Sequence, residues 1–223
     1  MNFAIPHLLF IVLAFVAAII SLSVHEFSHA LCAYWMGDTT AQRAGRLTLN
    51  PLAHIDIFGT VILPLVLVFL NSPIMFGLAK PTPINPMFFR KYRIGQLLVA
   101  AAGPLSNFIL ATLSGITLAV VYRLLGPENL LVIFLQAMVV TNVVLGIFNL
   151  FPIPPLDGAK VLHGVLGPRG DGFMRNLERW GPYIFIAFLL INSMIPILGF
   201  IAAVILYILS LLLGVPVFPS ASL

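Results

Sequence analysis

The sequence predicts an all-α polytopic membrane protein that forms a single domain over residues 1–223. Of these residues, 61% are hydrophobic and only 8% are charged, whereas soluble proteins average about 25% charged residues. Eleven basic and seven acidic side chains, with a net charge of +4, are too few to cover a soluble globule or to follow a nucleic-acid backbone. One cysteine excludes a disulfide framework and a zinc site made of cysteines. We therefore expect a lipid bilayer around the protein and no nucleic-acid partner.

Long uncharged stretches predict a core of three membrane helices. No Asp, Glu, Lys or Arg precedes Glu26, and residues 94–122 and 129–156 are also free of them. A membrane-spanning helix needs about 20 apolar residues, and each of the three stretches is long enough. The predicted core helices are residues 7–36, 94–125 and 129–150.

A further apolar stretch, residues 57–79, is too short and too broken for a full span. It contains Gly59 and Pro64, and the sequence Asn-Ser-Pro at 71–73 is typical of a turn. We therefore predict a re-entrant segment that enters the membrane and returns to the same side. Irregular backbone at that depth has to be buried in protein or line a wet cavity.

The basic residues favour this topology. If segment 57–79 returns to the side from which it came, all eleven Lys and Arg residues except Arg123 face the cytoplasm, as the positive-inside rule favours. A full crossing would divide them between the two sides. We expect a multi-pass protein, located in the cell (inner) membrane if the source is a prokaryote.

The C-terminal apolar stretch, about residues 180–214, is long enough for one long helix or two short ones. Asn192 and Pro196 divide it, and an interior proline removes a backbone donor and kinks a helix. The sequence is compatible with one or two C-terminal membrane helices.

The first core helix carries a metal-binding pattern, His25-Glu26-Phe27-Ser28-His29. Residues i and i+4 share a helix face, so His25 and His29 can offer two imidazole nitrogens to one zinc ion. Glu26 lies about 100° around the helix, where it can reach a water on the metal rather than the metal. This pattern is often accidental in soluble proteins, but three ionisable residues in one turn of a membrane helix indicate a functional site.

The helix continues about 10 Å beyond the second histidine, at 1.5 Å per residue. In the predicted topology this end of the helix is the cytoplasmic one. We therefore expect the site inside the bilayer and towards its cytoplasmic face.

Tetrahedral catalytic zinc takes three protein ligands, and the sequence offers three candidates for the third. Cys32 lies on nearly the same face as His29, but a small buried residue is expected there. Glu178 lies in a charged segment that is predicted to be cytoplasmic. Asp157 is the better candidate, because it follows the third core helix at a depth similar to that of His29. From spacing alone, Asp157 could equally be only the N-cap of a short helix that follows it.

Three motifs together resemble the site-2 protease family of intramembrane zinc metalloproteases. They are the His-Glu-x-x-His pattern in the first apolar helix, Gly-Pro-Leu-Ser-Asn at 103–107, and Asn-Leu-Phe-Pro-Ile-Pro-Pro-Leu-Asp-Gly at 149–158. Segments 49–56 and 76–85 also resemble the short bacterial members of that family. The resemblance covers about residues 20–165.

The resemblance implies one zinc ion per chain, bound by His25, His29 and Asp157, with Glu26 as the general base. It also implies that Asn149 assists substrate or oxyanion binding. The catalytic core would span about residues 7–165. The re-entrant segment and an edge strand near residues 80–85 would correspond to the substrate-presenting elements of the family, so the expected fold includes short membrane-associated strands.

Two features differ from other members of the family. Many members carry a PDZ or CBS domain, for which 223 residues leave no room. Archaeal-type members have an extra helix before the His-Glu-x-x-His helix, which we do not expect in this chain. We therefore expect that accessory domains do not select the substrate.

Other polar residues are candidates for supporting roles. His54 and Asn107 could hydrogen-bond to a zinc-bound imidazole or contact substrate. His54 could also be an ordinary cap at the membrane interface, and Asn107 could be a polar contact between packed helices. Asn142 is expected to hydrogen-bond between helices, and His163 is expected to be structural.

These expectations predict a zinc metalloendopeptidase that hydrolyses peptide bonds within or near transmembrane segments of membrane-protein substrates, as in regulated intramembrane proteolysis. One alternative is a membrane zinc transporter, which would also place His and acidic residues in membrane helices. Transporters usually show paired or inverted repeats, and the sequence shows none. The other alternative is a metal-binding membrane protein without protease activity.

Overall fold

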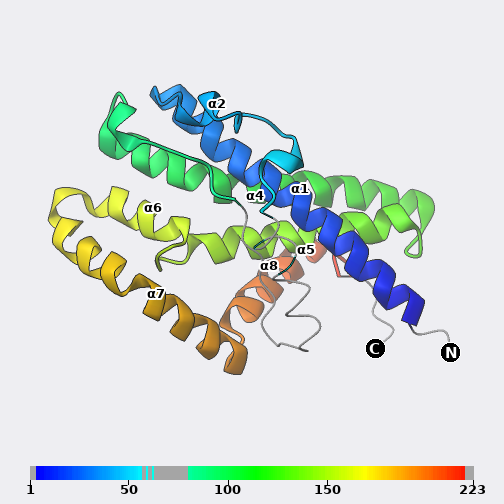
Figure 1. The fold of residues 1–223 in the computed structure, drawn as a ribbon. Coiled ribbons are helices and arrows are strands. Elements are labelled where there is room, and N and C mark those ends of the chain that lie inside the picture. Colours follow the sequence, from blue (N-terminus) through cyan, green and yellow to red (C-terminus); the bar gives the residue numbers. More distant parts are fainter. Residues whose placement is uncertain (1–3, 57–58, 60–61, 63–79, 219–223) are drawn as a thin grey trace.

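The computed structural model describes residues 4–56, 59, 62 and 80–218 (Figure 1). The predicted re-entrant segment 57–79 therefore lies outside the described residues, apart from Gly59 and Ile62. The described part of the chain is mainly helical. Its α-helices are α1 (Ala4–Met36), α2 (Thr40–Arg43), α4 (Tyr92–Leu125), α5 (Leu130–Leu150), α6 (Asp157–Leu166), α7 (Asp171–Met194) and α8 (Ile197–Leu213), and its 3-10 helices are Pro51–Ala53, Pro86–Phe88 and Gly167–Gly170.

The three predicted core helices are α1, α4 and α5, and their ends lie within three residues of the predicted ones. Local chemistry explains the hairpin between α4 and α5. Gly126 follows α4 with a φ of 79°, a conformation that is open to glycine. Asn129 then caps α5, because its side chain accepts a hydrogen bond from the Leu131 N–H at 2.9 Å.

The three core helices pack against one another through small and branched side chains. Ala17 of α1 is fully buried with Ala137 and Met138 of α5, and small residues allow such helices to approach closely. A second buried cluster joins α4 and α5 to α8 through Leu118, Val139 and Leu206, among others. In Figure 1, α1 crosses the α4–α5 hairpin, so that residues near the middle of α1 face both helices.

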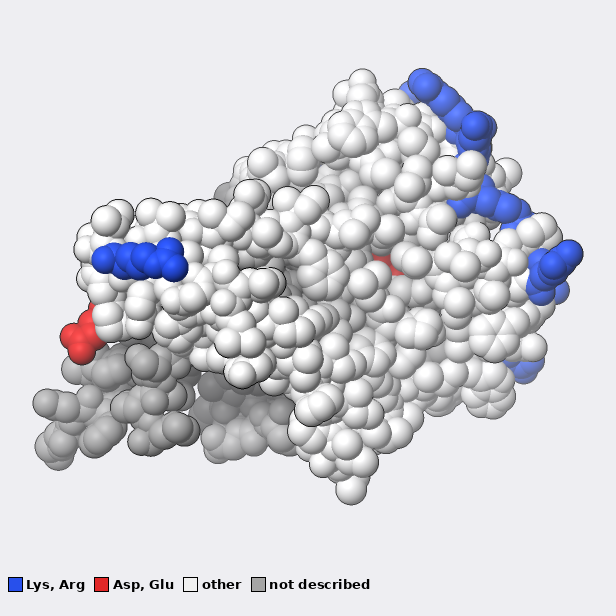
Figure 2. Space-filling model, turned by 180° about the vertical axis from the view of Figure 1, so that it is seen from behind, with Lys and Arg blue, Asp and Glu red and all other residues white. Residues whose placement is uncertain are grey.

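Three described helices are long and apolar enough to cross a membrane. They are α4, α5 and the part of α1 from Val12 to Met36. The helical stretch Asp157–Met194, which ends with α7, passes the same test only together with α8, as a pair that is bent by 64°. The chain is therefore an integral membrane protein. Figure 2 shows Lys and Arg gathered mainly at one end of the molecule, with a broad uncharged surface between the two ends. That separation is the one expected from the charge-free stretches, while the side of the membrane on which each end lies stays a prediction.

The C-terminal apolar stretch forms two helices, separated at Ile195 and Pro196. Pro196 has no N–H with which to continue a helix, and α8 begins one residue later. The Asn192 side chain accepts a hydrogen bond from the Leu198 N–H at 2.9 Å, which satisfies one of the free amides at the start of α8. The same two residues that divide the sequence therefore shape the bend.

The connection from α5 to α6 brings Asp157 back towards the core helices. Residues 151–156 make no helix, and prolines at 152, 154 and 155 prevent α5 from continuing. Helix α6 begins directly against the end of α5, since a Cβ on Gly158 would collide with the Leu150 carbonyl oxygen. A residue with no side chain is required at this point, and Asp157 stands next to it.

The expectation of an edge strand near residues 80–85 is wrong, because the structure has no strand within its described ranges. Two backbone amides of the segment bind partners that are not strands. Thr82 N–H donates to the Glu26 carboxylate at 2.8 Å, and Asn85 N–H donates to the Asp38 carboxylate at 2.7 Å. Pro81 and Pro83 have no N–H at all. The segment therefore follows α1 as an irregular chain.

Candidate metal centre and active site

Three buried side chains from distant parts of the sequence meet at one point. His25 and His29 lie one turn apart on α1, and Asp157 is the first residue of α6. The two histidine Nε2 atoms are 3.0 Å apart, and Asp157 Oδ2 lies 3.1 Å from His25 Nε2 and 3.0 Å from His29 Nε2. The three residues are 3%, 6% and 8% exposed, respectively. The structure thus brings the predicted histidine pair and the preferred third candidate together.

This donor set fits zinc. Zinc takes imidazole nitrogen and carboxylate oxygen as ligands at about 2.0–2.2 Å, and ligands at that distance in a tetrahedral site lie roughly 3.3 Å apart. The observed separations of 3.0–3.1 Å are slightly shorter. Asp157 does not act as an N-cap instead, because Leu156 holds that position and no side chain caps α6.

The other ring nitrogen of each histidine has its own partner. His25 Nδ1 lies 2.6 Å from Asn107 Oδ1, and His29 Nδ1 lies 2.6 Å from the Val99 carbonyl oxygen, both on α4. An oxygen acceptor at Nδ1 fixes the ring orientation and leaves Nε2 unprotonated for a metal. Asn107 therefore contacts an imidazole and also makes a polar contact between helices, through Asn142.

Gly103 provides the room that the two imidazoles need against α4. A Cβ at this position would collide with His29 Nε2 and would lie 2.7 Å from His25 Nε2. Gly103 and Asn107 are four residues apart and share one face of α4. This face is the wall against which the histidine rings lie.

Glu26 is half-buried beside the histidine pair, and a residue outside α1, Thr82, binds its carboxylate. Its Oε2 accepts the Thr82 N–H at 2.8 Å, and the Thr82 hydroxyl donates to the Glu26 backbone carbonyl oxygen at 3.2 Å. Asp38, which is fully buried two residues beyond the end of the same helix, binds the other end of this segment at Asn85. Segment 80–85 is thus fastened along α1 at the level of Glu26.

Two of the residues that the sequence suggested make other contacts. The Asn149 amide donates to the Leu145 carbonyl oxygen at 3.0 Å, one turn back on α5. The His54 ring is buried, and its Nε2 lies 2.8 Å from the Thr48 carbonyl oxygen. Neither side chain belongs to the group of donor atoms formed by the histidine pair and the aspartate.

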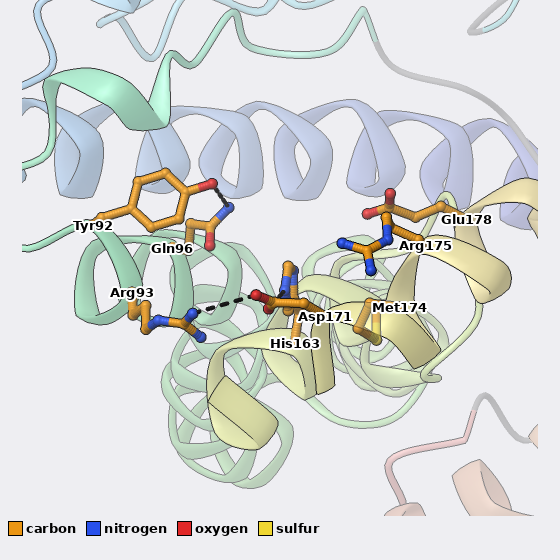
Figure 3. Close-up of a pocket in the computed structure, with 8 residues that line it drawn as sticks. All are labelled: Tyr92, Arg93, Gln96, His163, Asp171, Met174, Arg175 and Glu178. Atoms are coloured by element: carbon orange, nitrogen blue, oxygen red, sulfur yellow. Dashed lines mark hydrogen bonds and ion pairs between the residues drawn. The ribbon is translucent and has the colours of Figure 1, made fainter. Parts of the chain in front are cut away.

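The alternative third ligands also lie outside this group. Cys32 is a half-buried free cysteine on α1. Glu178 lines a polar pocket that is formed by helix α6 and by the first turns of α4 and α7 (Figure 3). In this pocket Asp171 contacts both His163 and Arg93. His163 Nε2 lies 3.0 Å from Asp171 Oδ1, which is a contact that ties α6 to α7.

Sequence reasoning missed the contacts made by Thr82 and Val99. Both are made by backbone atoms, the Thr82 N–H and the Val99 carbonyl oxygen. Every residue has such a carbonyl, and every residue except proline has such an N–H. A side-chain pattern carries no signal for them. Asn142, expected only to link helices, proves to contact Asn107 directly, with its Oδ1 2.9 Å from Asn107 Nδ2.

The fold and the site together define a class of protein: an integral membrane protein with a buried group of two histidines and one aspartate that could hold a metal ion. Residues 126–192 match the family model of Peptidase family M50. The chain belongs to this family, the site-2 protease family. Membership implies Zn²⁺ as the cofactor, and the donor set described above fits it.

The chain is similar to several curated proteins. It is 41% identical over 177 residues to "Putative zinc metalloprotease YwhC" of Bacillus subtilis, over 77% of each chain. It is 32% identical over 176 residues to "Putative zinc metalloprotease Rip2" of Mycolicibacterium smegmatis, over 77% of this chain and 64% of that protein. Identity to the Rip2 protein of Mycobacterium tuberculosis is 31% over 185 residues, covering 81% of this chain and 66% of the relative. The chain thus spans slightly less than two thirds of the Rip2 proteins. No solved structure matches the chain.

Proposed function

We propose that this protein is an intramembrane zinc metalloprotease that cleaves peptide bonds within or near transmembrane segments of other membrane proteins. The convergence of His25, His29 and Asp157 inside a bundle of membrane-length helices carries the proposal. Family membership supports peptidase chemistry. The location of two of the three donors within the membrane-length part of α1 supports a reaction at membrane depth.

In the proposed site, the two histidines provide Nε2 atoms and Asp157 provides a carboxylate oxygen to hold the zinc ion. When bound, zinc supplies Lewis-acid activation of the scissile carbonyl and of the attacking water. Asn107 and the Val99 carbonyl keep the histidine Nδ1 atoms occupied. Both rings are then held in the orientation that presents Nε2 to the metal.

Glu26 acts as the general base. It takes a proton from the attacking water and returns it to the leaving nitrogen of the cleaved peptide bond. The Thr82 amide binds Oε2 of the carboxylate, which leaves Oε1 to receive the proton. Thr82 therefore fixes the position of Glu26 without competing for the atom that reacts.

Substrate binding completes the proposal. Hydrogen bonds inside a substrate helix shield its peptide bonds, so the helix has to unwind locally before cleavage. Asn149 would contact the unwound chain: one N–H of its amide donates to Leu145, while the second N–H and Oδ1 can bind a substrate carbonyl or amide. We further propose that the site lies towards the cytoplasmic side, as the distribution of basic residues indicates.

Cleavage of a membrane-anchored model substrate by the purified chain in lipid vesicles tests the function. The wild-type protein should hold about one zinc per chain and cleave the substrate, and a chelator should stop cleavage. Glu26→Gln keeps a similar shape without a basic carboxylate, so it should retain zinc and lose cleavage. Full activity of Glu26→Gln would exclude Glu26 as the base. Zinc uptake into the vesicles without any cleavage would favour a transporter instead.

A further inference from the structure

A chain of buried polar side chains runs from one histidine through all three core helices. His25 Nδ1 of α1 contacts Asn107 Oδ1 of α4 at 2.6 Å, and Asn107 Nδ2 contacts Asn142 Oδ1 of α5 at 2.9 Å. Asn142 Nδ2 then contacts Ser21 Oγ of α1 at 2.8 Å. Both asparagines and Ser21 are completely buried. Polar side chains are rare inside membrane helices and are expected to serve a function there.

Backbone carbonyls determine which group donates in each hydrogen bond of this chain. The Asn142 amide faces the Met138 carbonyl oxygen at 2.8 Å, and a carbonyl can only accept. The Ser21 hydroxyl donates its one hydrogen to the Ala17 carbonyl oxygen at 2.7 Å, so it also accepts from Asn142. The NH₂ end of Asn142 is therefore fixed on this side, and its oxygen has to face Asn107.

The same reasoning continues to the histidine. The Asn142 oxygen needs a donor, so Asn107 presents its NH₂ end there, where it also lies 3.4 Å from the Ser21 carbonyl oxygen. The Asn107 oxygen consequently faces His25 Nδ1, which has to carry the proton. Turning either amide around would place two donors or two acceptors against each other. The chain thus selects one tautomer of His25, with a free electron pair on Nε2.

His29 reaches the same tautomer by a different route. Its Nδ1 faces the Val99 backbone carbonyl, which no substitution of a side chain can remove. His25 depends on side chains alone for its Nδ1 partner. The orientation of His25 is therefore the part of the site that remote residues can change.

We propose that Asn142 and Ser21 are positioning residues for the metal ligand His25, which they reach through Asn107. Each residue keeps the next amide turned correctly, and the last amide keeps His25 Nε2 available for zinc. The inference rests on the proposed zinc site but not on proteolysis, and metal affinity measures it directly. A polar contact that only joined the helices would contribute to stability and leave zinc affinity unchanged.

Asn142→Leu tests the proposal, because leucine has a similar size and neither donates nor accepts. Loss of a partner beyond the ligands typically weakens metal binding about 10- to 100-fold, and we expect the zinc dissociation constant to rise within that range. Gln136→Leu is the matched control. Gln136 lies on the same helix, is 2% exposed, and uses its amide to bind the Pro216 and Phe218 carbonyls rather than the site. It should lose thermal stability and keep the wild-type zinc affinity.

Zinc affinity is measured by competition with a chelator on the full-length chain in detergent, and the cobalt-substituted protein reports the ligand geometry by its absorption spectrum. Ser21→Ala is a milder variant that leaves the Asn142–Met138 contact in place, and it should weaken zinc binding less than Asn142→Leu does. Wild-type affinity in both Asn142→Leu and Ser21→Ala would overturn the proposal, as would equal losses in Asn142→Leu and Gln136→Leu. His25→Ala separates failure of the proposed zinc site from failure of the positioning role of Asn142 and Ser21. If His25→Ala leaves zinc affinity unchanged, the proposed zinc site itself is wrong.

Discussion

The three-helix core and the second half of helix α7 are both strongly apolar, but the core and α7 place their polar residues differently. The core buries and pairs several polar side chains, among them Ser21, His25, His29, Asn107, Gln136 and Asn142. On α7 only Met174 and Gly181 are buried, and the charged residues stand at its beginning, beside the pocket in Figure 3. Burying polar groups at membrane depth is costly. The core therefore contains the chemistry, while α7 is attached to it from outside.

The attachment of α7 is mainly aromatic and steric. Phe188 packs against Phe151 with ring centroids 4.8 Å apart and ring planes inclined by 44°, and the Phe185 ring centroid lies 6.2 Å from that of Phe148. A Cβ on Gly181 would lie 2.7 Å from the Pro154 side chain, so the helix approaches the turn after α5 closely there. Substitutions of core residues that contact the histidines, directly or through the asparagines, should therefore change zinc binding and catalysis, whereas substitutions around α7 should change stability alone.

The largest effect is expected from Gly103→Ala in the core. The new methyl group would collide with His29 and crowd His25 Nε2, so the imidazoles have to move. The variant should lose most of its zinc and at least about 100-fold in activity, as a misplacement of 1 Å in an active site typically costs. Zinc content per chain and cleavage rate measure both losses.

Gly115→Ala is the control for this variant. Gly115 lies on the same helix, but a Cβ there would meet the flexible end of the Leu213 side chain at 3.0 Å, far from the metal site. It should keep its zinc. If both alanine variants kept zinc equally well, close approach at Gly103 would not be required for the site.

The second largest effect is expected at Thr82, whose backbone N–H donates a hydrogen bond to the Glu26 carboxylate. Thr82→Pro removes the N–H, and the catalytic rate should fall about 10- to 100-fold, a part of the 10²- to 10⁴-fold that general acid–base catalysis contributes. Zinc content should not change, because Thr82 does not contact the metal-binding group. Single-turnover cleavage of the model substrate and zinc analysis separate the two quantities.

Thr82→Ser keeps both the amide and the hydroxyl and should behave as the wild type. Thr82→Val keeps only the amide and should lose less activity than the proline variant. A proline variant with full zinc and an unchanged cleavage rate would show that Glu26 needs no such support.

The same contrast explains which features the sequence predicts. Helix ends in the core follow from charge-free stretches and from caps such as Gly126 and Asn129, which are local signals. The spacing of His25 and His29 is local as well. Asp157 joins them only through the path of the chain around α5, which no periodicity encodes, so spacing left its role open between ligand and cap.

The failures of the sequence prediction have physical causes too. The family resemblance alone implied an edge strand near residues 80–85, but two amides of this segment bind the Glu26 and Asp38 side chains instead of a neighbouring strand. The chain from Asn107 to Ser21 depends on which helix faces touch. Its signal in the sequence was limited to single polar residues in apolar helices, which indicate a contact without naming the partner.

A smaller effect is expected at the bend between α7 and α8. Asn192→Ala leaves the Leu198 N–H without its acceptor, and loss of such a cap costs about 1 kcal/mol. The variant should unfold more easily in a denaturant titration. Its zinc affinity should equal that of the wild type, because the bend does not contact the core site; a weakened zinc site would mean that α7 and α8 shape the core after all.

The smallest effect is expected from Asp171→Asn at the beginning of α7. The hydrogen bond with His163, together with the Arg93 guanidinium, holds the pKa of the Asp171 carboxyl below its ordinary value of 3.8. A lowered pKa in the folded state stabilises the fold above that ordinary value, and this contribution disappears as pH falls through the lowered pKa.

Wild-type protein should therefore be slightly more stable than Asp171→Asn at about pH 6, and the difference should shrink as the solution is acidified below the ordinary pKa. Arg175 and Glu178 line the same pocket and are unchanged in the variant, so they cancel in the difference. The effect is small because Asp171 is exposed to solvent, which screens such pairs. Melting temperatures of both proteins over this pH range give the measurement. A difference that grew on acidification would place the stabilising charge elsewhere, and a loss of zinc in Asp171→Asn would break the separation between α7 and the core.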